Sequence, residues 1–163
     1  MTESAYELSA TVRAEIERWR AKFPEGRQRS AVIAALHAVQ HEDGYLSPEA
    51  MQAVAACLEL PPIQVFEVAA FYSMFETRPV GRHSISVCTN ISCMLCGGDE
   101  ILEHVKRKLG IEPGQSTPDG KFYLKQEFEC LAACNNAPMM MVDHVYHENL
   151  TPERVDEILD SLE

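Results

Sequence analysis

The sequence predicts an α+β protein with a small helical bundle at residues 1–78 and a mixed α/β domain at residues 79–163. In the first part, apolar residues recur about once per helical turn. After a linker at residues 77–81, the pattern changes to the polar–apolar alternation of a half-buried strand, beginning at residues 83–87. This change of period, together with the proline and glycine in the linker, sets the predicted boundary between the two parts.

Four helices are expected in the first part, because breaks and start signals fall between four apolar patterns. Pro24 and Gly26 interrupt the chain after the first pattern, and Pro61 stops the third. Ser47 followed by Pro48 is a typical helix start, with a hydroxyl cap and proline in the first turn. Short helices joined by short turns form a small bundle. The expected helices cover residues 10–22, 28–41, 48–59 and 62–71.

The second part is expected to alternate strands and helices. A helix at 98–109 has apolar residues on one side and ends at Gly110. Thr151 and Pro152 begin the last helix. The expected strands are residues 83–87, 121–129, the apolar run 139–142, and 145–147, and the last helix covers 152–162.

Charge and hydropathy exclude several classes of protein. The chain has 14 Lys and Arg against 25 Asp and Glu, a net charge of −11. Such a surface repels phosphate backbones, so no nucleic-acid partner is expected. No apolar run approaches the ~18 residues of a membrane span, so direct membrane insertion is not expected. The N-terminus carries no secretory signal pattern, and we expect a cytoplasmic protein.

Two cysteine pairs suggest a metal centre. Cys88 and Cys93 form a C-x4-C pair, Cys130 and Cys134 form a C-x3-C pair, and 36 residues separate the pairs. Cysteines in a cytoplasmic protein stay reduced, so paired spacings indicate metal or redox chemistry. A [2Fe–2S] cluster takes four thiolates, two for each iron. Backbone N–H groups within residues 89–92 and 131–133 are expected to donate hydrogen bonds to the sulfurs.

The alternative is a zinc site with four cysteine ligands, or a dithiol. Zinc prefers pairs with two intervening residues, which the x4 and x3 spacings do not provide. Cys93 and Cys96 do form one C-x2-C pair, which suits half a zinc site or a thioredoxin-like redox pair. Either interpretation leaves Cys88, Cys130 and Cys134 unexplained. We therefore favour the cluster, with Cys96 either near it but unligated or a spare thiol.

Other candidates have simpler interpretations. Cys57 lies in an apolar helix and is expected to be a small core residue. His37 and His41 are four residues apart, but no third metal ligand is evident, so a solvated or core-edge position is favoured. The methionine run 139–141 is either a soft lining beside the cluster or a buried strand. The isolated Gly97-Gly98 pair is no dinucleotide-binding fingerprint.

At the cysteines and their surroundings the sequence resembles the E-type subunit of bacterial NADH-quinone oxidoreductase, the counterpart of the 24-kDa subunit of mitochondrial complex I. The resemblance covers nearly the whole chain. The residues that carry it are 70–72, Cys88 and Cys93 with their spacing, 117–122, 129–134, 137–138 and 148–153.

The resemblance implies a helical N-terminal part, a thioredoxin-like C-terminal domain, and one [2Fe–2S] cluster held by Cys88, Cys93, Cys130 and Cys134. It also implies a partner subunit that binds FMN and NADH, so that this chain alone carries no complete active site. Equivalent subunits occur in NAD-linked hydrogenases and formate dehydrogenases. Ala132 stands where glycine is often found between the last two ligands, which bears on the backbone geometry of that loop.

Overall fold

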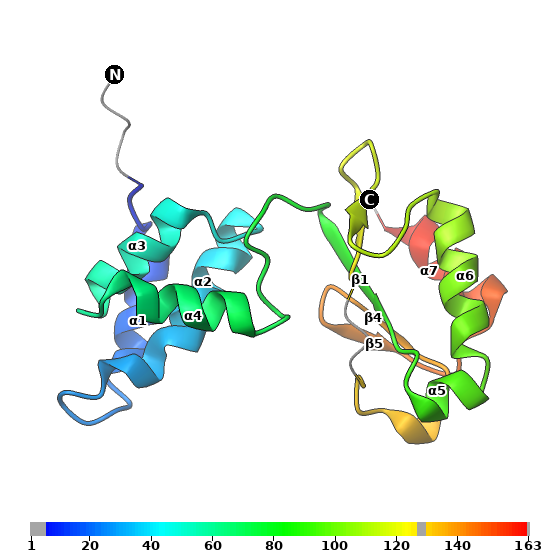
Figure 1. Cartoon of the computed structure of the whole chain (residues 1–163), viewed down its shortest axis with the longest axis horizontal. Coiled ribbons are helices and arrows are strands. Elements are labelled where there is room, and N and C mark those ends of the chain that lie inside the picture. The colour runs from blue at the N-terminus through cyan, green and yellow to red at the C-terminus, as the bar shows by residue number, and fades with distance from the viewer. Residues whose placement is uncertain (1–5, 127–129, 163) are drawn as a thin grey trace. The chain divides into compact units, whose positions relative to one another are not determined.

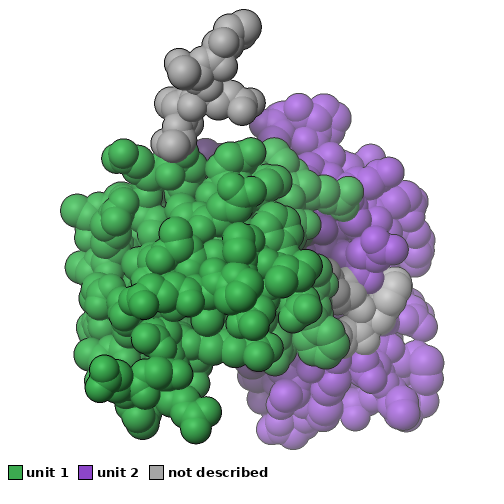
Figure 2. Space-filling model, turned by 60° about the vertical axis from the view of Figure 1, so that its left-hand side comes forward, with its two compact units in different colours: residues 1–79 green, residues 80–163 purple. Residues whose placement is uncertain are grey.

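The computed structural model describes residues 6–126 and 130–162. The chain divides into two compact units, residues 1–79 and 80–163 (Figure 2). Each unit has its own hydrophobic core. Within the described residues, we find no helix with both the length and the apolar character needed to cross a membrane.

The described residues of the first unit form four α-helices, as the sequence predicts (Figure 1). Serine side chains cap the N-termini of two of them. Ser9 Oγ accepts from the Val12 N–H at 3.1 Å, and Ser47 Oγ accepts from the Ala50 N–H at 3.1 Å. The prediction for residues 28–41 was wrong at its start, because Gln28–Ala31 forms a 3₁₀ turn, η1, before the α-helix begins. The helices are α1 (Ala10–Arg20), α2 (Val32–Asp43), α3 (Pro48–Cys57) and α4 (Pro62–Phe71).

The core of the first unit lies between these helices. Ile16 of α1, Leu36 of α2, Val54 of α3 and Val65 of α4 are fully buried in one cluster. Burying a side chain of this size stabilises the folded state by roughly 1.5–3 kcal/mol. Each helix therefore contributes its apolar face to a common core, which is why the helical period could be detected in the sequence.

A five-stranded mixed sheet forms the second unit, in the order β2-β3-β1-β4-β5. The central strand β1 (His83–Val87) pairs parallel with β3 (Phe122–Leu124) and antiparallel with β4 (Met140–Val142). The edges are β2 (Gln115–Ser116) and β5 (Val145–His147), each antiparallel to its neighbour. The remaining elements are α5 (Ile91–Leu95), α6 (Gly98–Leu109), the 3₁₀ turn η2 (Cys134–Asn136) and α7 (Pro152–Ser161).

Most predicted elements of this unit are present, but one prediction fails. Strands 83–87 and 145–147 and the helix 98–109 have the predicted bounds. The predicted strand 121–129 is too long, because β3 ends at Leu124, and residues 127–129 lie outside the described part of the chain. Three short elements of this unit have no clear pattern in the sequence and were not predicted: α5, β2 and η2.

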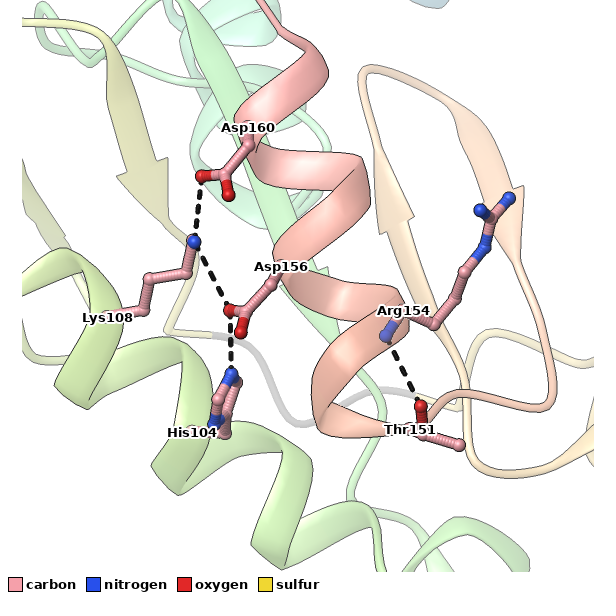
Figure 3. Close-up of polar contacts among 6 residues, drawn as sticks. All are labelled: His104, Lys108, Thr151, Arg154, Asp156 and Asp160. Carbon is pink, nitrogen blue, oxygen red and sulfur yellow. Dashed lines mark hydrogen bonds and ion pairs between the residues drawn. The ribbon is translucent and has the colours of Figure 1, made fainter.

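Helices α6 and α7 pack together beside the sheet, and a polar cluster joins their exposed sides (Figures 1 and 3). His104 Nε2 lies 2.8 Å from Asp156 Oδ1. Lys108 Nζ lies 3.2 Å from the same oxygen and 2.8 Å from Asp160 Oδ1. Thr151 Oγ1 accepts from the Arg154 N–H at 3.2 Å and begins α7. The cluster therefore joins helices whose buried faces share one core.

We predict that Asp156→Asn flattens the acid limb of the stability curve. The hydrogen bond with His104, supported by Lys108, lowers the pKa of Asp156 below its ordinary value. A lowered folded-state pKa gives stability that is present above the ordinary value of ~3.9 and lost as the pH falls through the lowered pKa. Urea unfolding between about pH 2 and pH 6 measures the effect.

The control is Glu157→Gln, which breaks the exposed pair between Glu157 and Arg154 within α7 and leaves Asp156 in place. This variant should lose stability in acid as the wild type does. Parallel curves for Asp156→Asn and the wild type would contradict the prediction.

Candidate metal centre

The pairing of β1 with β4 brings the two cysteine segments to one end of the sheet. Val87, the last residue of β1, pairs with Met140, the first residue of β4. The ladder continues one step further, where the Cys88 N–H donates to the Met139 carbonyl at 3.1 Å. Because the strands are antiparallel, the chain after β1 and the chain before β4 must leave the sheet together.

The first pair is buried. Cys88 directly follows β1, whereas Cys93 lies within α5 and not in the loop that the sequence predicts. Asn90 is extended at the start of this helix, and its carbonyl accepts from the Met94 N–H at 2.8 Å. Cys88 and Cys93 are each 2% exposed, and both lie in a small apolar cluster with Met139.

The second pair is exposed and close together. Cys130 Sγ lies 3.5 Å from Cys134 Sγ. Ala132, between them, has φ of +63°, and the Asn136 N–H closes η2 on the Ala133 carbonyl at 3.0 Å. The predicted position of this pair directly after a strand is not found in the described residues, because β3 ends at Leu124.

Two further hydrogen bonds hold the chain that follows Cys134. The Asn149 N–H donates to the Asn136 carbonyl at 2.9 Å, and the Leu150 N–H donates to the Pro138 carbonyl at 2.9 Å. The segment before α7 therefore holds the chain that follows the second cysteine pair in place.

All four predicted ligands come together. The Cys88 thiol lies close enough to the Cys93 and Cys130 thiols to interact with both, and Cys134 lies close enough to interact electrostatically with Cys93. Two sulfurs on one tetrahedral metal, with bonds of about 2.3 Å, lie ~3.8 Å apart. The separation between Cys130 and Cys134 is close to that value.

The donor set suits a [2Fe–2S] cluster. Four thiolates in two pairs can supply two ligands to each of two irons. Zinc prefers pairs with two intervening residues, and neither Cys88–Cys93 nor Cys130–Cys134 has that spacing.

Backbone N–H groups are directed at the sulfurs. Asn90 and Leu131 donate to Cys88, and the Ala132 N–H donates to Cys130 Sγ at 3.4 Å. These donors lie in the segments where the sequence places them. The Met139 N–H donates to Cys93 and was missed, because its position depends on the β1–β4 pairing. Such donors stabilise negative charge on sulfur.

The protonation of the thiols follows from burial and these hydrogen bonds. Burial acts to raise the pKa of Cys88, but the N–H groups of Leu131 and Asn90 outweigh it, so that pKa is lowered. Burial, followed by the hydrogen bond with Cys88, raises the pKa of Cys93 to about 11. The Ala132 N–H acts to lower the pKa of Cys130, but the neighbouring Cys134 raises it overall. A bound metal ion would deprotonate such thiols outright.

Gly98 allows α6 to approach the first cysteine pair, a role that was not predicted from the sequence. A Cβ atom at Gly98 would lie 2.8 Å from the Cys88 carbonyl oxygen and 2.8 Å from the Cys93 carbonyl carbon. Only glycine leaves room for both backbones. The available signal was the Gly97-Gly98 pair, directly after the cysteines and at the start of a helix.

The remaining candidates lie outside the thiol group. Cys96 is exposed at the end of α5, and Cys57 is half-buried against the first core. His37 Nε2 contacts Met74 Sδ at 3.1 Å, a core-edge position. The methionines at 139 and 140 pack in different places. Met139 packs with the buried cysteines, and Met140 belongs to the main core of the second unit.

The fold and the family model together define a class of protein: the thioredoxin-like domains of the [2Fe–2S] ferredoxin type. Residues 16–163 match the family model of the thioredoxin-like [2Fe–2S] ferredoxins. The chain belongs to this family. The predicted α+β fold class, with N-terminal helices and a thioredoxin-like domain, is thereby confirmed.

Curated relatives agree with this assignment, and each is named as the E-type subunit of an NADH-quinone oxidoreductase. The second such protein of Rhizobium meliloti (strain 1021) is 44% identical over 151 residues, covering 93% of this chain and 88% of the relative. That of Rickettsia bellii (strain RML369-C) is 44% identical over 142 residues, covering 86% and 84%. That of Mycobacterium tuberculosis (strain CDC 1551 / Oshkosh) is 42% identical over 141 residues, covering 86% and 55%. The predicted resemblance to this type of subunit is confirmed.

Solved structures support the fold. The crystal structure of an NAD⁺-reducing [NiFe]-hydrogenase in the air-oxidised state matches with a TM-score of 0.70 at 24% identity, covering 84% of this chain. The chain spans only 24% of that hydrogenase chain. The H₂-reduced state matches with a TM-score of 0.67 at 23% identity, covering 77% of this chain and 21% of the hydrogenase chain.

We predict that Ala132→Gly stabilises the protein. The φ of +63° at Ala132 costs an L-residue roughly 1–2 kcal/mol, and glycine removes this cost. Glycine also makes the unfolded chain more flexible, which offsets part of the gain in stability. The free energy of unfolding should rise by about 0.5–1 kcal/mol. Ala133→Gly is the control: Ala133 has φ of −112° and is buried, so this change should destabilise. Equal effects would contradict the account.

We predict that Gly98→Ala disrupts the thiol group. The new methyl must displace the backbone of Cys88 or Cys93, because both contacts are with main-chain atoms. The loss of stability in urea unfolding should exceed the ~1 kcal/mol expected for Gly110→Ala, where glycine has φ of +68° but open space around it. A smaller loss for Gly98→Ala than for Gly110→Ala would show that the approach is not tight.

Proposed function

We propose that this protein is the electron-transfer subunit of an NADH dehydrogenase of the NADH-quinone oxidoreductase type. It would hold one [2Fe–2S] cluster on Cys88, Cys93, Cys130 and Cys134. The observation that carries the proposal is the meeting of these thiols, in two pairs, at one end of a thioredoxin-like sheet. The names of the relatives support the larger complex.

The protein's own residues would hold and shield the site. A [2Fe–2S] cluster, when bound, supplies the ability to take and give one electron at a time. Cys88 and Cys93, with Met139, would exclude water from one side, since all three are almost fully buried. The backbone N–H groups of Asn90, Leu131, Ala132 and Met139 would orient the thiolates and offset their negative charge.

NADH and FMN would bind to a partner subunit. NADH gives up two electrons as a hydride, so a flavin must stand between it and a one-electron carrier. This chain contains no G-x-G-x-x-G dinucleotide fingerprint. The chain would therefore exchange single electrons with the flavin of the partner and would complete no reaction alone.

The surface around the cysteines suits such a partner. Ile91 and Leu95 of α5 are 72% and 76% exposed, beside the buried Cys93. Segments 83–105 and 126–153, which carry all four cysteines, contain eight Asp and Glu and no Lys or Arg. An exposed apolar helix in an acidic part of the sequence fits a partner with an apolar, basic surface.

A second candidate is the equivalent subunit of an NAD-linked hydrogenase or formate dehydrogenase. The observation behind this alternative is that the fold of this chain is similar to part of an NAD⁺-reducing [NiFe]-hydrogenase. The site on this chain would be the same in each case, and the terminal acceptor would differ. Isolation of the intact complex with a tagged chain, followed by identification of the other subunits, distinguishes them.

We predict that the purified protein is brown, bleaches with dithionite, and gives the electron paramagnetic resonance signal of a reduced [2Fe–2S] cluster. Cys134→Ala should abolish that signal, because it removes one of two ligands of one iron. An unchanged signal in Cys134→Ala would overturn the ligand assignment. A colourless wild type with one zinc per chain would support the zinc alternative instead.

Cys96→Ala and Cys57→Ala are the matched controls. Both remove a thiol, and neither residue is among the four proposed ligands. Both variants should keep the full signal. Loss of the signal in Cys96→Ala would move the first ligand pair to Cys93 and Cys96.

A further inference from the structure

The second cysteine pair is arranged to react with itself. Cys130 Sγ and Cys134 Sγ lie 3.5 Å apart, and both residues are exposed. A disulfide needs a sulfur–sulfur distance of about 2.05 Å, so the sulfurs must approach by roughly 1.5 Å. The turn at Ala132, with φ of +63°, already brings the two side chains to the same side of the loop.

Among the described residues, the other cysteines near the site do not form a second exposed pair. Cys88 and Cys93 are each 2% exposed. Cys96 is exposed, but the nearest cysteine in sequence, Cys93, is buried. Thiol–disulfide exchange requires a small-molecule disulfide to reach the attacking sulfur, so access selects among thiols.

We propose that Cys130 and Cys134 form a reversible disulfide when the site holds no cluster. The oxidant would be a low-molecular-weight disulfide of the glutathione type. One cysteine sulfur attacks a sulfur of that disulfide, forms a mixed disulfide and releases one small thiol. The second cysteine then attacks the protein sulfur of the mixed disulfide and releases the second small thiol. Two electrons and two protons pass from the cysteine pair to the two released thiols.

The disulfide would act as a redox gate on cluster insertion. It ties up two of the four proposed ligands while Cys88 and Cys93 stay reduced, so a cluster can be built only after reduction. This consequence rests on the proposed function, whereas the disulfide itself rests only on the distance and the exposure.

The two pairs can be measured separately in the full chain. Cleavage after Lys and Arg leaves Cys88, Cys93 and Cys96 on residues 83–106, and Cys130 and Cys134 on residues 126–154. The cluster-free chain is exposed to oxidised glutathione, and its free thiols are alkylated with iodoacetamide. The chain is then cleaved, and the masses of the peptides are measured by mass spectrometry. We expect peptide 126–154 to lose both labels and two hydrogens, peptide 83–106 to keep three labels, and dithiothreitol to restore both labels.

Two variants and one further sample complete the test. Cys96→Ala should still lose both labels from peptide 126–154, and Cys134→Ser should carry glutathione on Cys130 instead. A disulfide within peptide 83–106, or two labels on peptide 126–154 after oxidation, would overturn the proposal.

Brown protein treated in the same way should keep its absorbance while its peptide 126–154 escapes oxidation. If peptide 126–154 is oxidised while the colour persists, the disulfide does not exclude the cluster, and the proposed control of cluster insertion is overturned. If the chain is already colourless and without iron when it is purified in the absence of air, and still forms the disulfide, the proposed function alone is overturned.

Discussion

The arrangement of the site depends on the antiparallel pairing of β1 with β4. Thirty-six residues separate the cysteine pairs along the chain, yet the register Val87 to Met140 makes Cys88 and Met139 neighbours. The bond from the Cys88 N–H to the Met139 carbonyl extends that ladder into the site. A shift by one residue would turn Cys88 toward the other face of the sheet, so the register determines whether the thiols meet.

The two pairs differ in their surroundings, and this difference links structure to chemistry. Cys88 and Cys93 are packed with Met139, whereas Cys130 and Cys134 are exposed on a loop held by the segment before α7. The buried pair limits the access of water and oxidants, and the exposed pair lies where a partner can approach. The same exposure makes the second pair open to oxidation when the site holds no cluster.

Helix and strand patterns in the sequence were sufficient to predict the main elements, because their apolar faces line two cores. Strand 83–87, helix 98–109 and the four bundle helices follow directly from that periodicity. The short helix α5 could not be found in this way, since Ile91, Met94 and Leu95 are apolar but exposed and define no buried face. The extent of β3 was overestimated, because loose alternation continues in the sequence after the pairing with β1 ends.

Spacing and resemblance selected the four cysteines as the proposed ligands, but they did not indicate the residues that support them. Gly98 acts through a tertiary contact with the backbones of Cys88 and Cys93, and Met139 acts through strand register. Ala132 adopts the left-handed conformation that glycine would adopt more easily, so the loop keeps its shape at a cost in stability. The most direct measurement of the central claim is the metal and sulfide content of the full chain purified without air. We expect two iron atoms and two acid-labile sulfides per chain. One zinc atom per chain without sulfide would contradict the account.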